Sequence, residues 1–138
     1  LPKNKTEKLV FIAGGIGITP FRSMIKSLLD KGEKRDIVLF YSNKSEAEIA
    51  YRELFDQAAR ELSIKIFYTL TDSNVRADWP GMRGFLTPEI IKQVVPDYTE
   101  RTFYISGPHA MVAMFEETLS KSGVSKNKIL SDYFPGFA

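Results

Sequence analysis

The sequence predicts an α/β fold: a doubly wound parallel sheet of five strands, in the order 3-2-1-4-5, with helices on both faces. Two observations lead to this prediction. Five apolar runs rich in Val, Ile, Phe and Tyr recur along the chain, and they are continuous rather than alternating. That pattern is typical of parallel strands covered on both sides. Helical segments separate most of the runs, and strand–helix–strand repeats indicate right-handed crossovers within one sheet.

The apolar runs give the predicted strands. They cover Lys8–Ala13, Asp36–Ser42, Ile64–Thr71, Arg101–Ser106 and Lys128–Phe134. In sheets of this class, ligands bind beyond the carboxyl ends of the strands, at the point where the strand order reverses. Here that point lies between the first and the fourth predicted strand.

The first two predicted helices have apolar residues at helical spacing. The first follows Thr19 and Pro20, which suit the N-cap and the first helical position, and Gly32 closes it. The second has its apolar face over Tyr51–Leu62, behind a predicted cap at Ser45.

Two further helices are predicted in the second half of the chain. A short one covers Pro88–Val95 with Thr87 as its cap, and another has its apolar face over Met111–Leu119 and ends near Gly123. The least regular segment, Asp72–Gly84, is interpreted as a loop at the carboxyl edge of the third strand.

Composition excludes several kinds of protein. The 138 residues suit one domain, and 43% hydrophobic and 26% charged residues are ordinary for a soluble globular protein. The absence of cysteine and the single histidine, His109, argue against disulfides and against thiolate or multi-histidine metal sites. A scattered net charge of +2 does not favour nucleic acid. No apolar run has the length of a membrane span and no signal peptide is visible, so we expect a cytoplasmic protein.

A glycine-rich turn follows the first predicted strand, in the run Gly14-Gly15-Ile16-Gly17-Ile18-Thr19-Pro20. Glycines permit positive φ and leave backbone N–H groups bare, and a helix N-terminus follows, so a phosphate group fits here. The spacing departs from G-x-G-x-x-G because Pro20 replaces the third glycine, and no P-loop Lys-Ser/Thr pair is present. From this run alone, an ordinary tight strand-to-helix turn remains the alternative.

A second turn containing glycine, Ser-Gly-Pro-His-Ala-Met at 106–111, follows the fourth predicted strand. The two turns together resemble the nicotinamide-binding half of the ferredoxin–NADP reductase superfamily. The tail Asp132-Tyr133-Phe134 is similar to the closing acidic–x–aromatic motif of that superfamily, and Leu39–Lys44 is similar to its second strand and turn. The resemblance covers essentially the whole chain.

The resemblance implies binding of NAD(P)H and transfer of its hydride to a flavin. It places Ser106, Thr19 and Phe134 beside the reacting rings, and it implies no metal. The residues expected to bind the dinucleotide are Gly14, Gly15, Gly17, Ile18, Thr19, Pro20, Ser42, Asn43, Lys44, Asp72, Gly107, Pro108 and Met111.

The chain departs from the superfamily pattern in two ways. Ser106 stands where the superfamily usually has cysteine before Gly-Pro, and no segment matches the Arg-x-Tyr-Ser/Thr motif of the flavin half. The chain also begins with Leu1-Pro2. We therefore expect residues 1–138 to be an NAD(P)-binding domain whose FAD- or FMN-binding partner lies upstream in a longer protein or on a separate subunit, with an unidentified electron acceptor. The alternative is a stand-alone nucleotide-binding or regulatory module without redox activity.

Cofactor choice depends on one carboxylate. Asp72 follows the third predicted strand, where it can accept hydrogen bonds from the adenosine ribose and repel a 2′-phosphate. This favours NADH over NADPH. Lys44 and Arg76 keep NADPH open as the alternative, and so does the interpretation of Asp72 as a plain turn residue.

Three other features have more than one interpretation. His109 is expected to line the pocket or face solvent rather than transfer protons, and Trp79 to pack onto the domain rather than cover adenine. Tyr133, Phe134 and Phe137 fit an apolar tail over the sheet edge as well as a flavin-side role.

Overall fold

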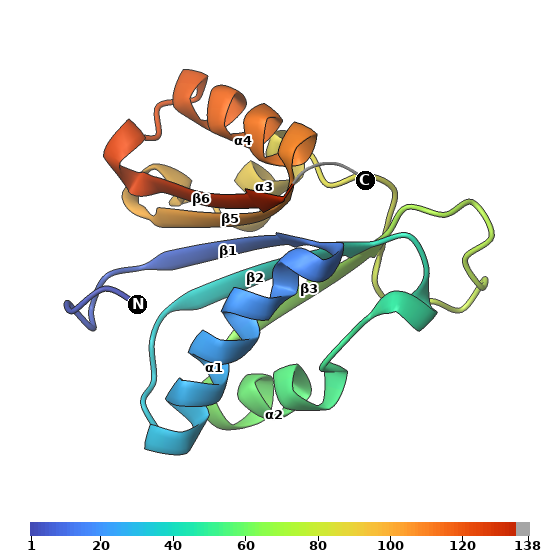
Figure 1. The fold of residues 1–138 in the computed structure, drawn as a ribbon, viewed down its shortest axis with the longest axis horizontal. Helices are drawn as coiled ribbons and strands as arrows, with labels where there is room; N and C mark the ends of the chain where they lie inside the picture. The colour runs from blue at the N-terminus through green and yellow to red at the C-terminus, as the bar shows by residue number, and fades with distance from the viewer. Residues whose placement is uncertain (135–138) are drawn as a thin grey trace.

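A computed structural model describes residues 1–134, with the backbone alone for the last two. Its strands form one six-stranded sheet in the order β4-β3-β2-β1-β5-β6, and every neighbouring pair is parallel (Figure 1). The strands are β1 (Leu9–Gly14), β2 (Ile37–Asn43), β3 (Lys65–Leu70), β4 (Met82–Arg83), β5 (Thr102–Pro108) and β6 (Ile129–Phe134).

The predicted number of strands is wrong, although the predicted order of the five long strands is confirmed. The sixth strand, β4, lies inside Asp72–Gly84, which the sequence predicted as a loop. The Gly84 N–H donates to the carbonyl of Leu70 at 2.8 Å, and the Thr69 hydroxyl donates to the carbonyl of Gly84 at 2.7 Å. These bonds hold Met82 and Arg83 beside β3, but two residues are too few to show a strand pattern in sequence.

Helices cover both faces of the sheet, as predicted: α1 and α2 pack on one face, and α3 and α4 on the other (Figure 1). The α-helices are α1 (Thr19–Lys31), α2 (Arg52–Leu62), α3 (Pro88–Val94) and α4 (His109–Lys121). Short 3-10 helices are η1 (Gly15–Ile18), η2 (Glu46–Glu48), η3 (Tyr98–Glu100) and η4 (Lys126–Lys128).

Strand β1 lies at the centre of the core, and all of its residues are buried. Its side chains alternate between the two layers, because successive side chains of a strand point to opposite faces. Leu9, Phe11 and Ala13 pack with α1 and α2, whereas Val10 and Ile12 pack with α3 and α4. Burial on both faces explains the unbroken apolar run at this strand.

The helix boundaries confirm some of the predicted caps and contradict others. Gly32 ends α1 at φ 63°, and the Thr87 hydroxyl accepts a hydrogen bond from Ile90 N–H at the start of α3. Thr19, in contrast, is not an N-cap, because η1 precedes α1 and Ile18 occupies the cap position. Ser45 caps no α-helix either: it precedes η2, and its side chain makes no capping bond.

Helix α2 begins later than the Ser45 cap implied. The backbone N–H of Ala50 donates to the Tyr41 hydroxyl at 3.0 Å, which holds this segment outside a helix. Tyr51 then adopts the left-handed conformation at φ 59°, and the helix starts at Arg52.

Candidate functional site

The two turns that contain glycine meet at the centre of the sheet. Strands β1 and β5 are neighbours, with Ala13 paired to Ser106, and the chain leaves them toward opposite faces through α1 and α4. This is the topological switch point, where open α/β sheets form their ligand-binding crevice.

Gly17 brings the two turns into direct contact. A Cβ atom at this position would lie 2.2 Å from the carbonyl oxygen of Ser106 and 2.8 Å from the nitrogen of Gly107. Only glycine at this position therefore allows η1 to contact the end of β5. Gly15 is required for a different reason, since it has φ +54° and no atom lies near a Cβ built there. Gly14 does not use the positive φ that glycine permits, because its φ is −115°.

Met111 joins the same cluster from α4. A Cβ at Gly14 would lie 2.7 Å from the Met111 sulfur, and one at Gly107 would lie 2.5 Å from the Met111 Cε. The thioether thus covers both turns, as a flexible side chain suited to filling irregular gaps. Met111 and Pro108 both lie close to Gly14, so the structure brings these predicted site residues together.

A shallow pocket of about 380 Å³ opens beside this contact. Its lining residues are Ile16, Gly17, Thr19, Pro20, Ser23, Ser106 and Asp132. The Thr19 hydroxyl donates to the carbonyl of Ile16 at 3.2 Å, and Ser106 is buried at the pocket wall. The bare backbone at Gly17 and the N-terminus of α1 fit an anionic or polar group placed here.

The sequence interpretation missed three residues of this pocket. Ser23 lies four residues after Thr19, one helical turn along the same face of α1, so helical spacing would have found it. Asp132 pairs with Ser106 in the sheet register, and its place in the terminal motif was the available signal. Ile16, at 73% exposure, has no signal in the sequence beyond its place between glycines.

The other predicted residues lie at the carboxyl ends of β2 and β3. Ser42 pairs with Gly14 in the register, which connects this region to the glycine turn. Asp72 N–H donates to the carbonyl of Lys44 at 2.9 Å, so these two oppositely charged residues are neighbours. Asn43 is 5% exposed, and its Nδ2 has no hydrogen-bond partner within the described part of the chain. A buried amide without a partner at the carboxyl end of a strand is unusual, and a ligand can supply the missing acceptor.

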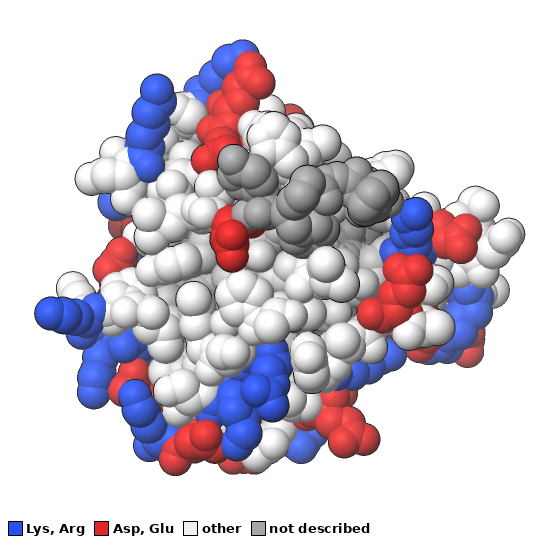
Figure 2. All heavy atoms as spheres, viewed as in Figure 1, with Lys and Arg blue, Asp and Glu red and all other residues white. Residues whose placement is uncertain are grey.

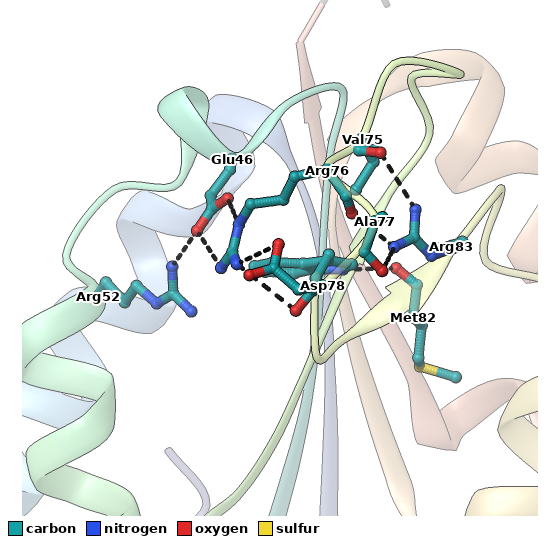
Figure 3. A network of polar contacts seen from close by, with 9 residues as sticks. Glu46, Arg52, Val75, Arg76, Ala77, Asp78, Met82 and Arg83 are labelled. Atoms are coloured by element: carbon teal, nitrogen blue, oxygen red, sulfur yellow. Dashed lines mark hydrogen bonds and ion pairs between the residues drawn. The ribbon is translucent and has the colours of Figure 1, made fainter.

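A polar network joins the loop that follows Asp72 to Glu46 of η2 and Arg52 of α2 (Figure 3). Glu46 accepts hydrogen bonds from Arg76 and Arg52, and Arg76 also pairs with Asp78 at 2.9 Å. Trp79 is 5% exposed and donates from Nε1 to the carbonyl of Met82 at 3.0 Å. The expectation that Trp79 packs onto the domain is confirmed.

The remaining residues that the sequence analysis singled out are Phe134, Phe137 and His109. Strand β6 ends at Phe134, opposite Pro108, but the Phe134 side chain and the whole of Phe137 lie outside the described residues. His109 is the first residue of α4 and is exposed. Within residues 1–134, no cluster of three or more potential metal ligands is present. In the same part of the chain, no helix has the length and hydropathy needed to span a membrane.

The fold and the paired turns at the switch point define a nucleotide-binding domain of the doubly wound class. The chain belongs to the family described as "Oxidoreductase NAD-binding domain", which it matches over residues 11–117, within the ferredoxin–NADP reductase superfamily. The resemblance found in the sequence is therefore confirmed.

Two curated relatives match nearly all of the chain. The glycine betaine monooxygenase reductase subunit of Pseudomonas aeruginosa (strain UCBPP-PA14) is 28% identical, over 93% of this chain and 35% of the relative. A subunit of the Na(+)-translocating NADH-quinone reductase of Yersinia pestis (strain Pestoides F) is 32% identical, over 97% of this chain and 34% of the relative. The chain thus spans about a third of the length of these relatives.

A solved structure shows the same fold. The flavohem-like FAD/NAD-binding domain of nitric oxide dioxygenase from Vibrio cholerae O1 biovar El Tor aligns with a TM-score of 0.83 at 19% identity. The alignment covers 99% of this chain and 54% of that one.

Proposed function

We propose that this chain binds NADH and presents its nicotinamide ring for hydride transfer to FAD or FMN held by another domain, upstream in the same protein or in trans. The observation that supports the proposal most is the contact of Gly17 with Ser106. It joins a helix N-terminus suited to the pyrophosphate with a polar pocket suited to the nicotinamide, at the switch point of the sheet.

The pyrophosphate would lie over η1 and the start of α1. The glycines there carry no side chain that would keep a ligand off the backbone, and the positive end of the helix dipole favours a negative ligand. The nearest carboxylate of the pocket, Asp132, lies on β6 beside Ser106. We place the nicotinamide, and not the pyrophosphate, beside Asp132, because a carboxylate repels a phosphate group.

The nicotinamide would occupy the pocket between Thr19 and Ser106. The carboxamide has both a donor and an acceptor, and the pocket is lined by three residues with hydroxyl groups, Thr19, Ser23 and Ser106, and by the Asp132 carboxylate. These groups would hold the ring in one orientation, which is the contribution of the protein to a transfer between two cofactors. The flavin supplies the redox chemistry when it is bound by its own domain.

The adenosine would extend toward Asn43, Lys44 and Asp72. Here Asp72 would accept hydrogen bonds from the ribose and disfavour a 2′-phosphate. Asn43 Nδ2, which lacks a partner among the described residues, is available to an acceptor on the ligand.

The surface beside the pocket suits a second protein domain. Ile16 is 73% exposed at the pocket edge. Figure 2 shows that neutral side chains fill most of the middle of the viewed face, while lysine and arginine lie mainly around its edge. Depletion of charged residues is a feature of the buried core of protein interfaces. The two relatives are named for a monooxygenase and for a quinone reductase, so the proposal names no electron acceptor.

The test is a titration of the purified 138-residue chain with NADH, followed by gel filtration with FAD and with FMN. We expect weak, saturable NADH binding and no flavin retained, because a single pocket wall cannot enclose a flavin ring. A chain that retains stoichiometric flavin would contradict the division into two domains. A chain that binds neither NADH nor its adenosine half would contradict the function itself, and NADH binding without flavin reduction in the complete protein would favour the regulatory alternative.

A further inference from the structure

Glu46 holds two arginines at the edge where the adenosine is proposed to lie. Its Oε1 accepts from Arg76 Nε at 2.7 Å, and its Oε2 accepts from Arg76 Nη2 at 3.1 Å (Figure 3). The same Oε2 accepts from Arg52 Nη1 at 3.3 Å. The Arg76 contact is bidentate, which is the stronger and more directional form of this pairing.

Both guanidinium groups are also held by an aromatic ring. The Arg52 and Arg76 Cζ atoms lie 5.4 Å and 5.8 Å from the centroid of the Trp79 ring. Trp79 is itself fixed by burial and by its hydrogen bond to Met82. Each arginine therefore has a carboxylate on one side and an indole face on the other.

Hydrogen bonds and an ion pair also hold the loop that carries Arg76 in one conformation. Arg83 donates to the carbonyls of Arg76 and Ala77 at 2.7 Å and 3.2 Å, and Asp78 pairs with Arg76. Hydrogen bonds from Arg76 and Arg52 outweigh desolvation and lower the pKa of Glu46, so its carboxylate is charged at neutral pH. The arginines are thus neutralised before any ligand arrives.

In the sequence, Glu46 and Arg76 lie close to residues of the proposed ribose site. Glu46 follows Lys44 by two residues, Arg76 follows Asp72 by four, and Lys44 and Asp72 are joined by a backbone hydrogen bond. A ribose 2′-phosphate bound there would need a guanidinium or ammonium partner. Arg76 would have to leave Glu46, Asp78 and Trp79 to become that partner.

We propose that Glu46 is a specificity-determining residue, which keeps the domain selective for NADH by holding Arg76 and Arg52 away from a ribose 2′-phosphate. This rests on the proposed function, in which the adenosine lies beside Asp72. Selectivity for NADH then has two parts. Asp72 repels the ribose 2′-phosphate directly, and Glu46 keeps the two arginines from forming the ion pairs that would offset this repulsion.

The test compares two adenosine ligands that differ only by the 2′-phosphate, 5′-AMP and adenosine 2′,5′-bisphosphate, together with NADH and NADPH. Calorimetric titration of the chain with Glu46→Gln should show the bisphosphate and NADPH binding about tenfold tighter, which corresponds to one added hydrogen bond between charged groups. Binding of 5′-AMP and NADH should stay within about twofold, and the gain should fall at high salt.

Two control variants make the result specific. Glu48→Gln removes the same charge from the same 3-10 helix, and a glutamine oxygen can keep the hydrogen bond that Glu48 Oε2 accepts from Lys44 N–H at 3.3 Å. Glu48 has no arginine partner among the residues described, so this variant should give no comparable gain. Adding Arg76→Ala to Glu46→Gln should remove most of the gain, which measures the coupling directly. Circular dichroism checks that each variant folds.

The outcomes separate the two proposals. An equal gain in Glu48→Gln, or a gain that survives Arg76→Ala and an added Arg52→Ala, would refute the role of Glu46 while leaving NADH binding intact. An unchanged preference in a folded Glu46→Gln chain would refute it as well. If the parent chain binds none of the four ligands, the proposed function fails first.

Discussion

Gly17 touches the main chain of Ser106 so closely that a Cβ on Gly17 would lie 2.2 Å from the Ser106 carbonyl oxygen. The atom in the way belongs to the backbone of a central strand and not to a flexible side chain. The first residues of the helical segment and the end of β5 are thus positioned by each other, and the pocket between them depends on that contact.

Replacing Gly17 with alanine should therefore separate the two turns. We expect Gly17→Ala to lower the free energy of unfolding by about 1–3 kcal/mol, as overpacking does, and to weaken NADH binding at least about tenfold. Gly15→Ala is the matched control, because its Cβ meets open space and only the left-handed backbone is strained, at a cost of about 1–2 kcal/mol. Urea unfolding and NADH titration measure both effects. Equal NADH affinity in Gly17→Ala and the parent chain would show that the contact does not shape the site.

Substitution of Asp72 tests the choice of cofactor. Asp72→Ala should weaken NADH binding by about 1–2 kcal/mol, the loss of a hydrogen bond to a charged group, and strengthen NADPH binding. The Asp72 carboxylate also accepts a hydrogen bond from Asn74 N–H at 3.3 Å. Asp72→Asn can keep that turn bond without the charge, so it should improve NADPH binding while leaving the fold unchanged. If the ratio of NADH to NADPH affinity moves in neither variant, Asp72 is a turn residue only.

A substitution at Ser106 tests the proposed nicotinamide site. In the chain combined with its flavin domain, Ser106→Cys should keep NADH affinity within a few-fold and preserve or raise the rate of flavin reduction. The reason is that Ser106 lines the pocket for the reacting ring, while most of the affinity lies in the adenosine and pyrophosphate contacts. Stopped-flow absorbance of the flavin measures the rate. A large loss of affinity at an unchanged rate would place Ser106 away from the ring.

Asp97 gives a prediction for stability against pH. Burial opposes its ionisation, but hydrogen bonds from Arg101 and Lys8 outweigh burial and lower the pKa of Asp97 below its usual value. A lowered pKa in the folded state stabilises the fold above the unfolded pKa of about 3.9, and this contribution is lost as pH falls through the folded value.

The stability difference between the parent chain and Asp97→Asn should accordingly be present at pH 7 and shrink below about pH 4. Urea unfolding across this range measures it, with Glu100→Gln as an exposed neighbouring control. A difference that stays constant from pH 7 to pH 3 would mean that the asparagine variant is less stable because of altered packing and not because of the lost charge.

Strands β1 and β2 were predictable because their burial is nearly uniform. Leu9–Gly14 and Ile37–Asn43 have almost every residue buried, so their composition alone distinguishes them, and their boundaries differ from the predicted ones by a single residue. The same reasoning could not find Met82–Arg83, which pairs with β3 only because the loop before it folds back. Thr19 was misplaced as a cap because the 3-10 turn at Gly15–Ile18 winds the chain before the α-helix begins.

The candidate site was predictable only in part, for a related reason. The two glycine turns follow strands whose order was predicted, so their meeting at the switch point follows from the topology. The pairing of Glu46 with Arg76 joins residues 30 positions apart through the irregular loop. The sequence has 19 basic and 17 acidic residues, and nothing in their spacing selects this pair.

The place of β1 in the sheet also affects the order in which the protein can fold during synthesis. Leu9 pairs with Ile37 on one side and with Thr102 on the other, so the strand made first gains its second neighbour only after most of the chain has left the ribosome. Until then, one edge of the most apolar strand has no partner and is open to association with other chains. We expect nascent chains that end before residue 102 to be protease-sensitive and to need chaperone protection, and pulse proteolysis of stalled chains of increasing length would measure when that sensitivity ends.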